Sequence, residues 1–162
     1  GNDEFVLSNF SPEEYRVHHA VVYTNDVNLS LRSRIIQQYE GYESYTIIAR
    51  SALVTSSSKI AGGCALMEGA IVNGAILAQN SVINTKAVIE HGCILGNNVF
   101  VGPGAIVCGD TCIGDNVLVG AGVIIRDGIE ITENVTIGMG SVVVRSIVEP
   151  GVYLGNPCRK IR

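Results

Sequence analysis

The chain has 162 residues, which is enough for one domain with a buried core and a small appendage. Its net charge of −4 at pH 7 and its pI near 5.3 argue against a nucleic-acid or anionic-membrane partner. Because no apolar run approaches the ~20 residues of a membrane span and no signal-peptide pattern is visible, we expect a cytoplasmic protein without membrane insertion.

Residues 1–47 predict a small, partial α/β subdomain. A strand is expected at 20–23, an amphipathic helix through the sequence VNLSLRSRIIQQ with Gly41 as its stop, and a second strand in SYTIIAR. This β-α-β fragment lacks the G-x-G-x-x-G turn of a dinucleotide site. It is expected to cap the first coil of the following domain, and the alternative is a subdomain that holds substrate.

Residues 48–147 repeat with a period of six, which fits neither a helix nor a simple strand and is typical of a parallel β-helix. Each hexad supplies one short strand and a corner, and three hexads close a coil of eighteen residues. The spacing of the aliphatic positions is six residues throughout, except for one spacing of five that is expected between Leu66 and Ile71. It separates the first four hexads from the remaining thirteen. The aliphatic positions of the long run are Ile71, Leu77, Ile83, Ile89, Leu95, Val101, Val107, Ile113, Val119, Ile125, Ile131, Ile137 and Val143.

Residues 148–162 no longer follow the repeat. Pro150 and Gly151 precede a short apolar return and the turn Gly155, Asn156 and Pro157. An open last coil would expose unpaired strand edges. We therefore expect this tail to fold back over the last coil.

Residues eighteen apart should stack in columns, so the sequence gives a map of the surface. Two columns lie close in sequence and contain little side-chain bulk. Together they suggest a shallow, glycine-floored track that runs from His91 and Asn84 toward the C-terminus. On composition alone, the alternative that the glycines only form the corners is favoured. The columns are Asn84, Gly102, Gly120 and Gly138, and Asn73, His91, Gly109, Asp127 and Arg145.

His91 is the only histidine of the repeat region and is the candidate catalytic residue. A neutral imidazole can take a proton from a hydroxyl or amine while that group attacks an acyl donor. Glu90 is the candidate to orient or polarise it. A zinc site needs three or four ligands, and the remaining histidines, His18 and His19, lie in the irregular N-terminal part, so no metal is expected. The five cysteines include no C-x-x-C pair, and Cys64 and Cys93 are expected to fill inward positions.

At these residues the chain resembles the hexapeptide acyltransferase superfamily of left-handed β-helix proteins. More narrowly, it resembles the bacterial sugar acetyltransferases that include sialic acid O-acetyltransferases and UDP-4-amino-sugar N-acetyltransferases. The resemblance runs from about Ala20 to Arg162. It is most specific in INTKAVIEHGCILGNNVFVGPGAIVCG and in the closing GVYLGNPCRKIR.

The resemblance implies an all-β, left-handed parallel β-helix that forms a homotrimer with acetyl-CoA in the clefts between neighbouring prisms. It also implies His91 as the base, Asn84 near the acceptor, and the Gly109 N–H at the thioester carbonyl. The expected activity is acetyl-CoA-dependent acetylation of a hydroxyl or amino group of a sugar or nucleotide-sugar in polysaccharide or nucleotide-sugar synthesis. The positions expected along the coenzyme are Gly109, Gly120, Ala121, Gly138, Met139, Arg159 and Lys160.

Two positions depart from the pattern of the family. Gly92 stands where members commonly carry an acid after the histidine, and Phe100 stands where many have a second histidine. The glycine-rich first βα unit of the family also has no counterpart in residues 1–47. Two alternatives therefore stay open, a non-catalytic trimeric scaffold and a hexapeptide acyltransferase with a different acceptor.

Overall fold

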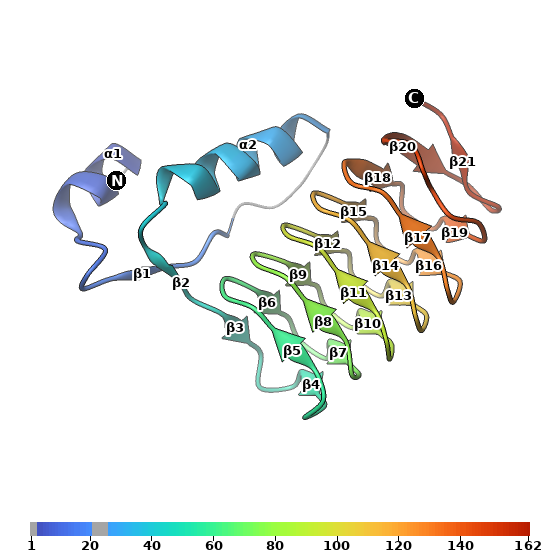
Figure 1. Ribbon diagram of the computed structural model, residues 1–162, viewed down its shortest axis with the longest axis horizontal. Coiled ribbons are helices and arrows are strands. Elements are labelled where there is room, and N and C mark those ends of the chain that lie inside the picture. Colours follow the sequence, from blue (N-terminus) through green and yellow to red (C-terminus); the bar gives the residue numbers. More distant parts are fainter. Residues whose placement is uncertain (1–2, 21–25) are drawn as a thin grey trace.

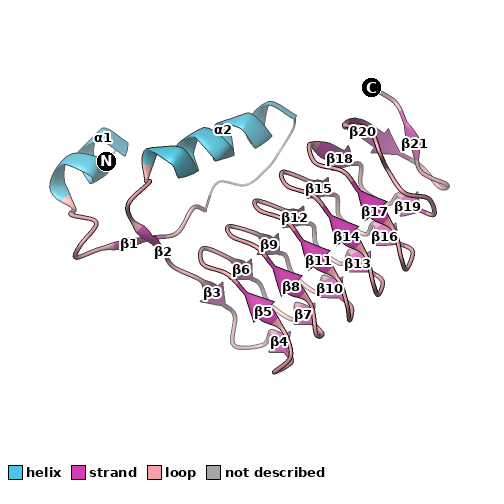
Figure 2. Cartoon of the chain, in the orientation of Figure 1, coloured by secondary structure: helices cyan, strands magenta, loops and turns pink. Residues whose placement is uncertain are grey.

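The computed structural model of the chain describes residues 3–20 and 26–162 (Figure 1). From Ile47 onward the backbone winds into a three-sided column of short parallel strands, β3 to β19, with three strands to each coil. Figure 2 shows that helices occur only in the N-terminal part and that strands are stacked through the rest. The parallel β-helix expected from the six-residue period is confirmed.

The three faces of the column are three separate sheets. The six-stranded face consists of β4 (Leu53–Val54), β7 (Ile71–Val72), β10 (Val88–Ile89), β13 (Ile106–Val107), β16 (Ile124–Ile125) and β19 (Val142–Val143). The five-stranded face consists of β5 (Lys59–Ile60), β8 (Ile76–Leu77), β11 (Ile94–Leu95), β14 (Cys112–Ile113) and β17 (Glu130–Ile131). The eight-stranded face consists of β3 (Ile47–Ile48), β6 (Ala65–Leu66), β9 (Val82–Ile83), β12 (Phe100–Val101), β15 (Leu118–Val119), β18 (Val135–Ile137), β20 (Gly151–Leu154) and β21 (Arg159–Lys160).

The chain passes around three corners in each coil. We call the turn from the eight- to the six-stranded face the first corner, the next turn the second corner, and the turn back to the eight-stranded face the third corner. The core is aliphatic, because the second residue of each regular two-residue strand from β6 to β19 points inward and is almost fully buried. Cys64 and Cys93 are fully buried fillers, as expected.

The position of the five-residue step was predicted wrongly. Ile71 is half-buried, whereas Val72 is fully buried and pairs in register with Ile89. The inward series therefore runs from Leu66 through Val72, and the short step falls between Val72 and Leu77. Its physical cause is a second-corner turn of three residues, 73–75, where the turns one coil below and one coil above have four.

The N-terminal part contains a β-α-β unit, but its first strand lies earlier than expected. The parallel strands are β1 (Arg16–Val17) and β2 (Glu43–Ser44), with α2 (Asp26–Gln38) between them. The helix agrees with the prediction, whereas the second strand of the unit lies earlier than expected: it ends at Ser44, where the predicted segment SYTIIAR begins, and Ile47–Ile48 within that segment forms β3 of the column instead. Ala20 is not in a strand, and the rest of the strand expected at 20–23 lies outside the described residues. A further short helix, α1 (Asp3–Asn9), was not foreseen.

Helix α2 packs on the third corner of the β-helix, along a ladder of asparagines (Figure 1). Arg32 is fully buried there and donates to the Asn80 carbonyl and to Oδ1 of Asn98. Ser33 contacts Asn98 and Asn116. These asparagines adopt positive φ angles near 60°, a conformation that asparagine tolerates better than most residues. Polar contacts with the repeat therefore hold the N-terminal segment, residues 3–20 and 26–46.

The C-terminal tail closes the last coil. Strand β20 pairs with β18, and β21 pairs with β20 in the antiparallel sense. Residues Gly155 and Cys158 exchange hydrogen bonds with Val142, and Ile147 bridges to Ile131. The last strand on every face is thereby paired, as the exposed-edge argument anticipated.

Candidate active site

His91 lies at the second corner, on the turn after β10. Its imidazole is exposed and leans over Gly109, the equivalent residue one coil above. A Cβ atom at position 109 would lie 2.7 Å from the ring Cε1 and 3.0 Å from Nε2. Residue 109 must therefore be glycine for the ring to take this place. The stack that the eighteen-residue coil predicted for this pair is present.

Gly109 also offers a hydrogen-bond donor beside the ring. Its neighbours Cys108 and Asp110 donate their backbone N–H groups to Ile125 and His91, respectively. The Gly109 N–H makes no hydrogen bond within the described part of the chain. A base and an unengaged backbone donor thus adjoin each other, which is the pair of groups that an acyl-transfer step requires.

The shortened turn lies directly beneath His91. Gly92 bonds to the carbonyl of Gly74, and Asn73 lies below Glu90 and donates its Nδ2 to that carboxylate at 3.1 Å. The predicted column of Asn73 under His91 is therefore wrong. The turn at 73–75 has one residue fewer than the turn at 90–93 above it, and the position without a counterpart is that of His91. His91 is therefore the lowest residue of its column.

Glu90 does not contact His91 through a hydrogen bond in the described structure. Its carboxylate accepts from Asn73, on the side of the corner that also carries Cys108. Burial raises the pKa of the Cys108 thiol, and the charges of Asp127 and Glu90 raise it further. Glu90 is thus engaged by Asn73, and its predicted orienting role stays a prediction.

Asn84 lies at a different corner from His91. It follows β9 at the first corner, and strand β10 separates the two residues. The expected single track from both residues is therefore wrong for one copy of the chain. The reason is that a hexad advances the chain by one corner, so residues seven apart flank a face rather than adjoin each other.

Asn84 instead lines a cavity of about 250 Å³ between the N-terminal segment and the eight-stranded face. The walls are mostly apolar and include Met67 and Phe100, while His18 and His19 come from the segment before α2. This cavity was not foreseen. The sequence does not show it, because its two sides come from separate parts of the chain that no repeat relates to each other.

The glycines above Asn84 have a structural cause. A Cβ at Gly102 would lie 2.7 Å from the backbone nitrogen of Ala121, and one at Gly120 would lie 2.6 Å from that of Met139. Close approach of successive coils therefore requires glycine at positions 102 and 120, whatever binds outside. Ala121 and Met139 project beside these glycines, and Met139 is 75% exposed.

Basic side chains gather at the C-terminal end. Arg145, Arg159 and Lys160 line a hollow of about 250 Å³ with Tyr153 and Cys158. Lys160 is paired with Glu149 at 2.9 Å. Arg145 stands three coils above His91 in the same column, about 14 Å along the axis at the usual strand spacing.

The described residues contain no cluster of three or more histidine, cysteine or acidic side chains that could hold a metal ion. Within the same residues, no helix is long and apolar enough to cross a membrane.

The repeat and the fold match a known family of transferases. A family model described as bacterial transferase hexapeptide, with six repeats, matches residues 110–145. The acetyltransferase domain of PglB from Neisseria gonorrhoeae FA1090 is 30% identical with a TM-score of 0.89, over 98% of this chain and 77% of that one. PglB has also been solved in complex with acetyl coenzyme A. Curated protein sequences contain no significant match.

A second solved structure is PerB from Caulobacter crescentus in complex with CoA and GDP-perosamine. It is 25% identical with a TM-score of 0.84, over 99% of this chain and 75% of that one. WeeI from Acinetobacter baumannii AYE, at 22% identity, a TM-score of 0.75 and coverage of 93% and 74%, shares the fold. The chain belongs to the hexapeptide-repeat acyltransferases, in the group of bacterial sugar acetyltransferases.

Proposed function

We propose that this protein is an acetyl-CoA-dependent acetyltransferase that acylates a hydroxyl or amino group of a sugar or nucleotide-sugar, with His91 as general base. The observation that carries the proposal is the imidazole stacked on Gly109, beside an unengaged backbone N–H. PglB and PerB support it, since one has been solved with acetyl coenzyme A and the other with CoA and GDP-perosamine.

The reaction uses these two groups in one step. His91 accepts the proton of the acceptor O–H or N–H while that oxygen or nitrogen bonds to the thioester carbonyl carbon. The Gly109 N–H donates to the oxyanion that forms. The tetrahedral intermediate then breaks its carbon–sulfur bond, and the imidazolium returns the proton to the departing thiolate.

We further propose that the site is shared between neighbouring copies of a homotrimer. In one copy, the Asn84 cavity lies at the corner before the six-stranded face, and His91 lies at the corner after it. That face presents an aliphatic side chain at every outward position, and an exposed apolar stripe of this length favours a protein contact. The residues of the stripe are Leu53, Ile71, Val88, Ile106, Ile124 and Val142.

In this arrangement the coenzyme lies in the groove between two copies. Gly109 and the basic hollow of Arg145, Arg159 and Lys160 belong to one wall, and the hollow suits the phosphates of CoA. Ala121 and Met139, beside Gly120 and Gly138, form the other wall against the pantetheine arm. The acceptor enters the Asn84 cavity, whose apolar lining and few polar groups are typical of a small-molecule site.

The test is a thiol-release assay with acetyl-CoA and a panel of amino and hydroxyl sugars and their nucleotide derivatives. His91→Ala should lose on the order of 10² to 10⁴ in rate, while the oligomer and the thermal shift with acetyl-CoA are retained. An equally active His91→Ala protein contradicts the assignment of the base. Wild-type protein with neither turnover nor a thermal shift supports the non-catalytic scaffold instead.

Mixing variants tests the shared site. His91→Ala and Asn84→Ala proteins, each of low activity, are unfolded and refolded together in equal amounts. If each site takes His91 from one copy and Asn84 from the next, about a quarter of sites regain both residues in random trimers. Activity that stays at the level of the separate variants places both residues in one copy and contradicts the shared arrangement.

A further inference from the structure

The His91 imidazole has no hydrogen-bond partner among the described residues, although a general base needs a group that fixes its orientation and tautomer. Three carboxylates lie around the second corner. Glu90 is on the same turn, and Asp110 and Asp127 are one and two coils above. The short turn beneath contributes Gly74, which has no side chain.

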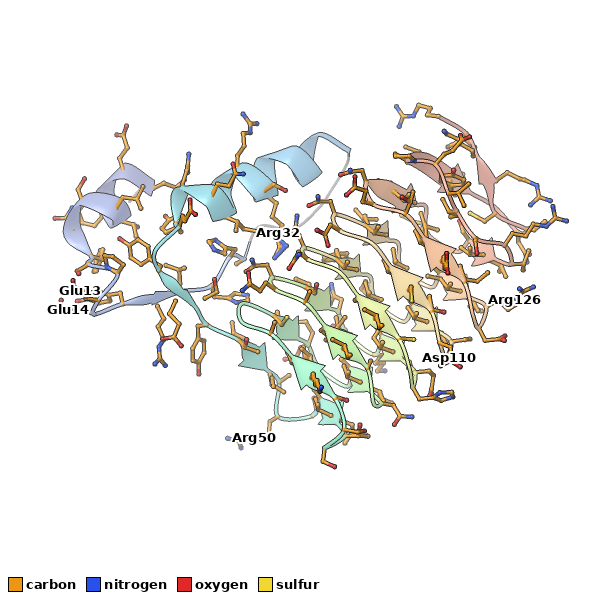
Figure 3. All side chains as sticks on the ribbon, viewed as in Figure 1. Glu13, Glu14, Arg32, Arg50, Asp110 and Arg126 are labelled. Atoms are coloured by element: carbon orange, nitrogen blue, oxygen red, sulfur yellow. The ribbon has the colours of Figure 1, made fainter. Side chains whose placement is uncertain are left out.

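Asp110 is the carboxylate that the geometry brings next to the ring. Its backbone N–H donates to the His91 carbonyl at 2.9 Å, which fastens the two turns together. Its side chain lies over Gly92, so that a Cβ at position 92 would collide with Asp110 Oδ1. The imidazole in turn lies over Gly109, the residue before Asp110. Each side chain therefore covers the sequence neighbour of the other. Figure 3 shows Asp110 at the edge of the column remote from α2.

The other two carboxylates are less suited. Glu90 accepts a hydrogen bond from Asn73 in the turn beneath. Asp127 stands beyond Gly109 in the column. Asp110 is exposed, its carboxylate makes no hydrogen bond with a described residue, and its φ angle of 57° is an unusual conformation for a residue other than glycine. Because no hydrogen bond holds the Asp110 carboxylate elsewhere, it can rotate toward the His91 imidazole.

We infer that Asp110 is the positioning residue for His91, and this inference rests on the proposed function. Its carboxylate accepts the N–H of one imidazole nitrogen, which leaves the lone pair of the other nitrogen for the acceptor, and it stabilises the imidazolium formed in the reaction. The carboxylate thereby fills the space that Gly92 leaves vacant. No hydrogen bond joins the two side chains in this structure, and such contacts commonly tighten only when substrate is bound.

Kinetics of the full-length oligomer test the role. Asp110→Asn keeps the shape and removes the charge, and it should lower kcat on the order of 10- to 100-fold with the KM for acetyl-CoA unchanged. Asp127→Asn, a matched loss of charge one coil higher, should change kcat less than about threefold. An Asp110→Asn enzyme with wild-type kcat overturns the inference. A larger loss in Glu90→Gln than in Asp110→Asn assigns the role to Glu90 and overturns it too.

A transfer of the carboxylate separates positioning from a structural role. Asp110→Gly fits the positive φ and should fold while losing kcat. The second substitution, Gly92→Asp, returns a carboxylate to the same space from the turn that carries His91. The double variant should have a kcat at least tenfold higher than that of Asp110→Gly. A double variant that is folded by circular dichroism and binds acetyl-CoA, but stays as slow as Asp110→Gly, contradicts the inference.

A spectroscopic measurement distinguishes failure of this inference from failure of the proposed function. The ¹⁵N chemical shifts of the His91 ring, assigned by their loss in His91→Asn, report the tautomer without any turnover. Asp110→Asn should change the tautomer ratio, whereas Asp127→Asn should not. Unchanged shifts in Asp110→Asn overturn the inference even in a protein that transfers no acyl group.

Discussion

The β-helix and the N-terminal segment are built from opposite kinds of contact. The buried residues of the β-helix are mostly aliphatic and repeat coil after coil. In the described part of the N-terminal segment the buried side chains are Tyr39, His19 and Arg32. Of these, Arg32 and Tyr39 are held by hydrogen bonds, and Tyr39 and His19 share an edge-to-face ring contact.

This difference indicates which part can be released without the other. A stack of coils loses apolar burial when any coil opens, so the β-helix should unfold cooperatively. The N-terminal segment adjoins it through hydrogen bonds, each of which contributes only about 0.5–1.5 kcal/mol net. We therefore expect the segment to detach before the column unfolds, and the Asn84 cavity lies at the boundary between the two.

The largest effect is expected in the column. Leu95 is fully buried, and the adjacent Ile94 on β11 is 48% exposed. Leu95→Ala should lower the free energy of unfolding by roughly 2–5 kcal/mol through lost burial and a cavity. Ile94→Ala should cost less than about 1 kcal/mol. Urea denaturation followed by circular dichroism measures both, and equal losses would contradict the inward and outward alternation.

A smaller and local effect is expected at the contact between α2 and the ladder. Arg32→Met leaves the Asn80 carbonyl and the Asn98 amide oxygen without the guanidinium, at about 1–3 kcal/mol for each buried group left unsatisfied. Amide hydrogen exchange should rise in α2 and stay slow in β10 and β13. Arg34→Met, on the same helix but exposed, is the control and should leave exchange in α2 unchanged. Faster exchange throughout the column in Arg32→Met would show that the two regions unfold as one.

The same contrast decides how much could be predicted from sequence. A six-residue period specifies the column, its coil length and the stack of His91 on Gly109, because every coil obeys the same rule. It could not place the short turn, since Ile71 and Val72 are both β-branched and either could point inward. The first strand of the N-terminal part was misplaced for a similar reason: two residues, Arg16 and Val17, form it through pairing with β2 rather than through any pattern of their own.

Neighbours within one corner could be predicted from the sequence, but the arrangement of the corners around the candidate site could not. Stacking within a corner follows from counting eighteen, and it gave Gly109 above His91 correctly but Asn73 below it wrongly. The separation of His91 from Asn84 depends on which corner each hexad turns, and the Asn84 cavity depends on a fold-back of the N-terminal segment. For Asp110 a signal did exist, namely a carboxylate nineteen residues after the histidine, above a glycine at position 92.

The smallest expected effect is a dependence of the N-terminal contact on pH. Burial lowers the pKa of His19 below its usual 6.5, and the charges of Arg32 and His18 lower it further. The docked segment therefore prefers neutral His19, and protonation favours the detached form. This contribution to stability is fully present above pH 6.5, the value expected for the detached state, and is lost as pH falls from there toward the lowered pKa of the docked state.

Hydrogen exchange in α2, corrected for the intrinsic effect of pH on exchange, should thus accelerate between pH 7 and pH 5 while exchange in the column does not. His19→Phe retains an aromatic ring against Tyr39, whose centroid lies 5.5 Å away, and removes the titration. The variant should flatten the pH dependence of α2. A pH dependence of exchange in α2 that persists in His19→Phe would contradict the assignment to His19.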